Sequence, residues 1–433
     1  MPPAAGGRID ALPDGVLEHI LGFLRADEAV RTCVLARRWR HLWKSATSLR
    51  IRHVAAGEHV RDLREFVYHL LLLRRGAPLQ ICDFYFHGFD DDDVPRVNLW
   101  FRYAVICNVR LLRLHVLPSD GRGLLELDDL PLVSQQLRIL DLQFVRVRSS
   151  FLNFSSCPAL KHLYCEFSEF SLSSETTTRT TISSDSLEHL SIVDSAFSDS
   201  DGSVERSRIR ICTPNLLSLR LRRLQGKTPM LVGDMPSLVQ ASVDIDDNCD
   251  DSCRKLLDPN LDCDCESCGC GWSNNSGQGE LGCVLLMGLS AAECLELTSV
   301  RSMFIFKRDL RWCTMFSELR TLTLNEYWCI SIDIGALACI LERSPVLEKL
   351  TLQLFSEGYE HKIEMKGTFS LMERSSAISE HLEEVKIKCD VVDERILGIL
   401  KFLCTFNIHA CRVIPYHGYI HWTLNKSSLW FNV

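Results

Sequence analysis

One pattern of apolar and polar positions recurs along the chain from residue 109 onward. An apolar residue is followed by two others, a second apolar residue, one other and a third apolar residue, as in Leu319, Leu322 and Leu324. Segments of this kind begin at residues 109, 137, 160, 187, 216, 238, 292, 319, 347 and 382. The alternation at the end of each segment predicts a short strand with one buried face.

The spacing of these segments indicates an array of repeats. Most successive starts lie 22 to 29 residues apart, which is the period of leucine-rich repeats. The step from 238 to 292 is 54 residues, twice 27, so one repeat has been lost or replaced there. A proline two residues ahead of four segments, as at Pro345, favours an extended entry into the strand. A single repeat cannot bury its own leucines, so stacked repeats are expected to build one continuous core and a curved solenoid.

The residues between the buried leucines point to the opposite face of each strand, because strand side chains alternate. We expect this face to be the concave face of the solenoid and to recognise another macromolecule. A sheet face that is merely solvated is the alternative for most single positions. The candidate target-binding residues are Arg113, Asp141, Tyr164, Arg220, Arg222, Lys386 and Lys388.

The first forty residues have a different, helical spacing of apolar positions. Pro13 and Asp14 suit the first turn of a helix whose apolar stripe includes Leu17 and Leu24. A second short helix is expected from Asp27 to Val34, with Asp27 as its cap. A third is expected to carry Leu35, Trp39, Leu42 and Trp43 on one side. Three short helices cannot enclose this apolar surface alone, so part of it should meet a partner or the following domain.

These residues resemble an F-box over residues 8–48. The resemblance rests on Leu12-Pro13, on the Val16/Leu17/Ile20/Leu24 stripe, and on the tryptophans of Arg38-Trp39-Arg40-x-Leu42-Trp43. It implies binding to a Skp-type adaptor and, through the adaptor, to the cullin and RING subunits of a ubiquitin ligase. The residues that it marks for adaptor binding are Leu12, Pro13, Leu17, Ile20, Leu24, Val30, Leu35, Trp39, Leu42 and Trp43.

This segment has two other interpretations. The helices would otherwise only cap a solenoid, or Arg37, Arg38, Arg40 and Lys44 would form a nucleic-acid patch between the tryptophans. Residues 8–48 hold seven basic and five acidic side chains, a surplus too small for phosphate binding. We therefore expect no nucleic acid among the partners.

The whole chain resembles plant F-box proteins that carry leucine-rich repeats and a C-terminal FBD-type region. This resemblance implies an α/β fold with a short N-terminal helical F-box followed by a curved solenoid of about ten irregular repeats. Residues 49–108 would connect the F-box to the array and form its first cap, residues 109–370 would form the repeats, and residues 371–433 would form an FBD-like region that caps the solenoid. The 54-residue step departs from a regular array, so no target is carried over from the family.

Composition narrows the location and the chemistry. The chain has 433 residues and a net charge of −8, with no apolar run long enough for a membrane span and no basic-then-apolar start typical of a secretory signal. We expect a protein of the cytoplasm or nucleus with no membrane partner. In such a reducing compartment its 20 cysteines would serve as small buried residues or metal ligands.

Seven of the cysteines lie between residues 249 and 283 in acidic surroundings. Cys263, Cys265, Cys268 and Cys270 are dense enough to surround one zinc ion, but structural zinc sites normally have two well-separated pairs of ligands. The preferred interpretation is an acidic loop inserted between repeats, with no metal and no cofactor.

Motifs of enzymes are missing from the chain. Gly226-Lys227-Thr228 has the end of a phosphate-binding loop but lacks the glycine five residues earlier, where Leu221 stands. The sequence therefore predicts a non-catalytic receptor: the F-box recruits a ligase and the repeats hold a target protein. A metal- or redox-responsive regulator acting through the cysteine-rich loop, and an F-box protein working outside a ubiquitin ligase, remain open alternatives.

Overall fold

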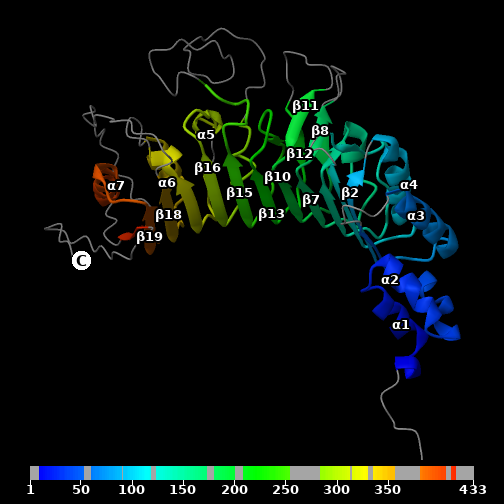
Figure 1. The fold of residues 1–433 in the computed structure, drawn as a ribbon. Helices are drawn as coiled ribbons and strands as arrows, with labels where there is room; N and C mark the ends of the chain where they lie inside the picture. Colours follow the sequence, from blue (N-terminus) through cyan, green and yellow to red (C-terminus); the bar gives the residue numbers. More distant parts are fainter. Residues whose placement is uncertain are drawn as a thin grey trace, which may run out of the picture. The chain divides into compact units, whose positions relative to one another are not determined.

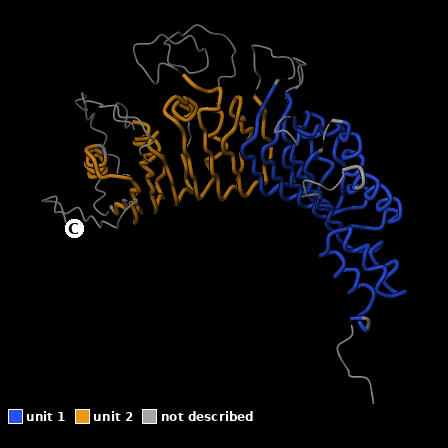
Figure 2. Tube along the Cα trace, viewed as in Figure 1, with its two compact units in different colours: residues 1–207 blue, residues 208–433 orange. Residues whose placement is uncertain are grey.

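The structure is a computed structural model with two compact units, residues 1–207 and 208–433, and each is described by itself (Figure 2). It describes residues 9–52, 60–89, 91–118, 123–172, 180–199, 208–253, 283–312, 315–329, 335–355, 381–405 and 411–415.

The first unit begins with short helices. They are η1 (Ile9–Ala11), α1 (Asp14–Leu21), α2 (Ala26–Arg31), η2 (Thr32–Val34), η3 (Arg37–Arg40) and η4 (Leu42–Ser45). The first predicted helix is confirmed, and it starts directly after Pro13. The second starts one residue earlier than predicted. Asp27 is not its cap, because the residue before the helix is Arg25, whose backbone N–H donates to the Glu28 carboxylate at 3.0 Å.

The predicted third helix is wrong. Its residues form two separate 3-10 turns, η3 and η4. Ala36 is extended at φ −159° and ψ 160°, and His41 leaves helical geometry at φ −123°, so no continuous helix passes through these positions. As a result Trp39 and Trp43 lie on different turns.

A parallel sheet follows in the first unit, in the order β1-β2-β3-β5-β7-β10 (Figure 1). Its strands are β1 (Ser48–Arg52), β2 (Ile81–Phe89), β3 (Leu111–Pro118), β5 (Ile139–Gln143), β7 (His162–Glu166) and β10 (His189–Val193). The predicted strands of segments 109, 137, 160 and 187 are confirmed as β3, β5, β7 and β10. The sequence did not predict β1 and β2, which lie in the expected connecting segment together with α3 (Val60–Arg74), η5 (Asp91–Asp93) and α4 (Val94–Ile106).

The second unit contains a parallel sheet in the order β13-β15-β16-β17-β18-β19-β20. These strands are β13 (Ser218–Arg222), β15 (Gln240–Ile245), β16 (Cys294–Ser299), β17 (Thr321–Asn325), β18 (Lys349–Leu354), β19 (Glu384–Cys389) and β20 (Cys411–Pro415). Its helices are α5 (Ile305–Asp309), η8 (Glu326–Cys329), α6 (Gly335–Glu342) and α7 (Glu394–Thr405). β15 pairs directly with β16, so the 54-residue step leaves no strand between them in the sheet.

The core of each unit is built by aligned leucines. Leu112, Leu140, Leu163 and Leu190 lie opposite one another on successive strands, and each is at most 1% exposed. In the second unit Leu295, Leu322 and Leu350 are aligned in the same way. Burying such a side chain fully contributes about 1.5 to 3 kcal/mol. The core therefore grows with every strand added, as the alternation predicted.

Short outer strands lie beyond the turns at the ends of the main strands. Phe144, Phe167 and Asp194 directly follow β5, β7 and β10 and have φ of 57°, 50° and 49°. This left-handed conformation turns the chain toward a second parallel sheet of β4 (Leu125–Glu126), β6 (Val145–Val147), β8 (Glu169–Leu172) and β11 (Ala196–Asp199). The remaining elements are η6 (Ser149–Leu152), β9 (Thr181–Ser183), β12 (Arg210–Cys212) and β14 (Met230–Leu231).

Candidate functional site

The first candidate surface lies on the N-terminal helices. Large apolar side chains are solvent-exposed on this region although it packs against α3 and β1. Val34 is 82% exposed and Leu35 is 69% exposed, both at the end of η2. Phe23, Ile9 and Val16 add exposed apolar area. Such a concentration within 27 residues is typical of a surface that a partner covers.

The residues predicted to bind the adaptor divide into two groups. Leu17, Trp39, Leu42 and Trp43 are buried in the chain's own core. The others reach the surface in part or in full: Leu12, Ile20, Leu24 and Val30 are half-buried, and Pro13 and Leu35 are exposed. The predicted adaptor-binding residues did not include the exposed Val34 and Phe23. Val34 was only the last residue of the expected second helix, and Phe23 lies outside the predicted apolar stripe.

The start of α1 is held by Arg38. Its guanidinium donates to the backbone carbonyl of Leu12 at 2.6 Å and to the Asp14 carboxylate at 2.7 Å. These contacts fix the Leu12-Pro13 turn against η3 in a charge-assisted, forked geometry. Arg38 therefore has a structural role, and Lys44 lies over the Trp43 ring at 5.6 Å.

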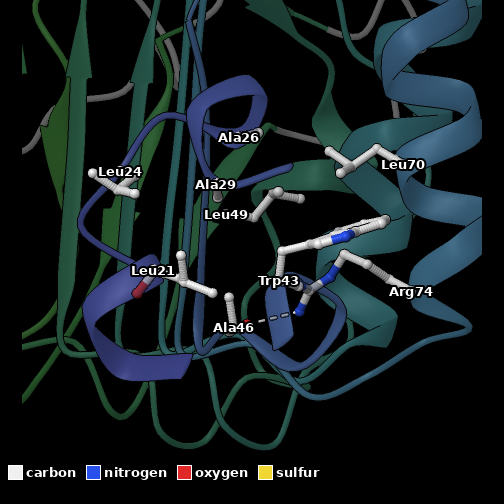
Figure 3. Close-up of a pocket in the computed structure, with 10 residues that line it drawn as sticks. Leu21, Leu24, Ala26, Ala29, Trp43, Ala46, Leu49, Leu70 and Arg74 are labelled. Atoms are coloured by element: carbon white, nitrogen blue, oxygen red, sulfur yellow. Dashed lines mark hydrogen bonds between the residues drawn. The ribbon is translucent and has the colours of Figure 1, made fainter. Parts of the chain in front are cut away.

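Arg74 connects these helices to α3. Its guanidinium is buried and donates to the carbonyl oxygens of Trp43 at 3.0 Å and Ala46 at 2.8 Å. Burial lowers the pKa of Arg74, but an arginine stays protonated in the physiological range. Figure 3 shows Arg74 and Leu70 of α3 directed toward Trp43 and Ala46. A small cavity beside them is lined by Leu21, Leu24, Ala26, Ala29, Trp43, Ala46, Ser48, Leu49, Leu70 and Arg74.

The second candidate surface is the solvent face of the parallel strands. In the first unit the register places Arg113, Asp141 and Tyr164 opposite one another on β3, β5 and β7. The Asp141 carboxylate pairs with Arg113 at 3.5 Å and with His115 at 3.2 Å. Tyr164 is 39% exposed and stacks on His162. The three predicted residues are thus brought together, but two of them satisfy each other's charge.

In the second unit one row of the register runs through Arg220, Ser242, Glu296, Thr323, Thr351, Lys386 and Arg412. Two predicted residues, Arg220 and Lys386, therefore lie near opposite ends of this row. Arg222 approaches Asp244 at 3.8 Å, and Asp244 also accepts a hydrogen bond from Thr298 at 2.6 Å. Lys388 lies one row further along β19, opposite Gln353.

The zinc candidates Cys263, Cys265, Cys268 and Cys270 lie outside the described residues. The described ends of the expected insertion belong to the fold, since Cys249, Asp251, Cys253 and Cys283 are buried. Asp251 forms a two-pronged ion pair with Arg208 at 2.6 and 2.5 Å and accepts from the Thr228 backbone N–H at 2.8 Å. The expected bounds 249–283 therefore include structural residues at both ends.

Two kinds of feature are absent from the part of the chain that the structure describes. No cluster of three or more His, Cys, Asp and Glu side chains is arranged to hold a metal ion there. None of the helices in those ranges combines the length and the apolar character that crossing a membrane requires.

Comparison with known proteins identifies the N-terminal helices. Residues 9–50 match the F-box domain. A putative F-box/LRR-repeat protein of Arabidopsis thaliana is 26% identical over 82% of this chain and 80% of its own length. Another such protein is 28% identical over 38% of this chain and 34% of its own, so that match spans about a third of the relative.

An Arabidopsis F-box/FBD/LRR-repeat protein is 30% identical over 36% of this chain and 40% of its own length. All three relatives are named for leucine-rich repeats, the repeat that the strand pattern predicted. The last of them is also named for the FBD region. The chain therefore carries an F-box domain at its N-terminus and is related to plant F-box/LRR-repeat and F-box/FBD/LRR-repeat proteins.

Proposed function

We propose that this protein is a substrate-recognition subunit of an SCF-type ubiquitin ligase. The F-box domain binds a Skp-type adaptor, which links it to the cullin and RING subunits, and the strand faces bind the target protein. The observation that carries the proposal is the exposed apolar surface of the F-box domain, with Val34 and Leu35 at its most exposed point. Exposed apolar surface of this kind marks interaction sites on proteins.

The two groups of F-box residues have different roles in this proposal. Trp39, Leu42, Trp43 and Leu17 hold the domain together, while Val34, Leu35, Phe23 and the half-buried Leu12 and Ile20 contact the adaptor. The buried Arg74 fixes the domain to α3. The adaptor surface is thereby held on the same compact unit as β1 to β10, which gives the ligase a defined attachment point.

The strands form a curved leucine-rich-repeat solenoid in this proposal, and the FBD-like region ends it. The protein itself carries out no chemistry. It holds the target near the charged conjugating enzyme and so raises the effective concentration of target lysines at the reactive thioester.

Co-purification with the adaptor tests the proposal directly. The full chain, expressed together with a plant Skp-type adaptor, is expected to form a stoichiometric complex. A variant with Val34→Ser and Leu35→Ser should bind the adaptor about tenfold more weakly, or weaker still, while keeping its thermal transition. A full chain that stays monomeric beside an excess of adaptor contradicts the proposal.

A further inference from the structure

Charge is distributed unevenly over the solvent face of the sheet in the second unit. On β13, β15 and β16 this face carries Arg220 and Arg222 together with Asp244 and Glu296, so its charges balance. On β18, β19 and β20 it carries four cations and one carboxylate: Lys349, Lys386, Lys388, Arg412 and Glu384. We call the four cations the basic face.

The members of the basic face are brought together by the strand register. Lys386 lies opposite Arg412, and Lys349 lies opposite Glu384. The side chains of Lys349 and Arg412 are on exposed positions, and the Lys386 side chain is 33% exposed. Hydroxyl and amide side chains of Thr323, Thr351, Gln353 and Asn325 continue the surface onto β17 and β18.

One carboxylate already present shows which group suits this surface. The Lys386 ammonium forms an ion pair with the Glu384 carboxylate at 2.9 Å. The pKa of Glu384 is lowered, first by the hydrogen bond from Lys386 and then by the charges of Lys386, Lys349 and Arg412. Three cations therefore act on a single carboxylate, and no carboxylate among the described residues pairs with Lys388.

We propose that the basic face binds an extended, carboxylate-rich segment of the target protein. This rests on the proposed function, because it names the chemistry of the target for which the strand face is the receptor.

The geometry favours several carboxylates spread along an extended chain. Lys386 and Lys388 stand two residues apart on one strand, about 7 Å by strand geometry. Alternate side chains of an extended peptide have the same spacing. Three of the four cations are lysines, which act as separate point charges and lack the planar fork that grips one phosphate with two parallel bonds.

Two strands of the sheet each carry two cations at the same spacing, so they provide a matched pair of double variants. Lys386→Gln with Lys388→Gln removes two cations of the basic face, and Arg220→Gln with Arg222→Gln removes two cations at the same spacing on β13. The order of strands separates β13 from β19 by five steps, about 24 Å, which is well beyond the screening length of about 10 Å at 0.1 M salt.

The probe is a labelled peptide that alternates Glu and Thr, and its partner is the same peptide with Gln in place of Glu. Binding to the full chain is measured by fluorescence anisotropy at low and at high salt. We expect the Glu peptide to bind and the Gln peptide to fail. The β19 variant should weaken binding about three- to tenfold, as two exposed charge pairs allow, and the β13 variant should weaken it less, because Asp244 and Glu296 already balance the charges of Arg220 and Arg222. Equal binding of the two peptides, or equal losses in the two variants, would overturn the inference.

Adaptor co-purification of the same samples separates this inference from the proposed function. If the adaptor binds and the Glu peptide does not, the proposed ligase function is supported and the proposal of a carboxylate-rich target segment is contradicted. If the peptide binds as expected but no adaptor binds, carboxylate binding by the basic face is supported and the proposed ligase function is contradicted. Thermal melts of both variants show that each is folded before binding is compared.

Discussion

Arg74 donates a hydrogen bond to the backbone carbonyl of Trp43 across 3.0 Å, although the two residues lie on different elements, α3 and η4. The same guanidinium reaches the Ala46 carbonyl at 2.8 Å. One buried cation thereby satisfies two carbonyl groups at the end of the F-box domain and joins that domain to α3.

The first prediction concerns this connection. Arg74→Met keeps much of the apolar stem but leaves two carbonyls without their donor, so the free energy of unfolding should fall by about 1 to 3 kcal/mol. Chemical denaturation of the full chain measures the loss. Arg75→Met, at the exposed neighbouring position, is the control and should have no such effect. Equal losses in both would show that the two hydrogen bonds do not contribute.

The second prediction separates contact residues from structural residues in the F-box domain. Val34→Ser with Leu35→Ser should weaken adaptor binding about tenfold or more and leave the melting temperature unchanged, because both side chains are exposed. Trp43→Ala should lower both, since Trp43 is 7% exposed. Titration with the adaptor and a thermal melt give the two readouts.

Leu72→Ser is the matched control for this pair. Leu72 is an exposed apolar residue of α3 that lies outside the F-box match. Its replacement should change neither readout. Adaptor binding that survives the Val34 and Leu35 changes would show that the contact surface lies elsewhere.

The third prediction tests the alternation along the strands. Leu322 faces the core at 0% exposure, while Thr323 of the same strand faces solvent. Leu322→Ala should destabilise the chain by about 2 to 5 kcal/mol, because it leaves a cavity in the shared core. Thr323→Ala should leave stability almost unchanged. Denaturant unfolding of the two variants decides the matter, and similar losses would contradict the assigned faces.

The fourth prediction concerns the buried pair of Arg208 and Asp251. Asp251→Asn leaves Arg208 buried without its counter-charge and should cost about 3 to 5 kcal/mol at neutral pH. Asp247→Asn, at an exposed position nearby, is the control.

The same pair predicts a dependence on pH. Burial raises the pKa of Asp251, but the hydrogen bonds and charge of Arg208 outweigh this, so the net pKa lies below its ordinary value. The stabilisation is thus fully present above the unfolded pKa of about 3.9 and is lost as pH falls through the lower, folded value. Stability curves of the wild type and of Asp251→Asn should converge in that acidic range. Curves that stay parallel in that range would show that protonation of Asp251 does not remove the stabilisation.

Local spacing was sufficient to predict the strands. The alternation around Leu322 and Leu324 predicts one buried face, and the structure has a strand with such a face in every segment from 109 to 382. In the last segment Val385 and Ile387 are buried, but the leading Leu382 is only half-buried. The F-box was also recognisable, because Leu12-Pro13 and the two tryptophans have the sequence spacing of that motif. Both signals lie within short stretches of chain.

Contacts between distant residues could not be predicted in this way. Trp39 and Trp43 were expected on one helix, but Ala36 and His41 interrupt it, and the turn geometry depends on packing against α1 and α3. The bond between Arg74 and Trp43 joins residues 31 positions apart, and no pattern in the sequence marks the pair.

The sequence by itself determined which residues are buried in the strands and that the chain begins with an F-box. Both follow from side-chain period and local spacing, since burying the leucines leaves each strand a single face for water. Only the tertiary structure decided which exposed charges are neighbours. Lys349 and Arg412 join Lys386 on one face because β18, β19 and β20 pair in a particular register. The Arg222 side chain, in contrast, forms an ion pair with Asp244. Register depends on hydrogen bonds between strands far apart in the chain, so the surface chemistry of this protein is a property of the folded sheet.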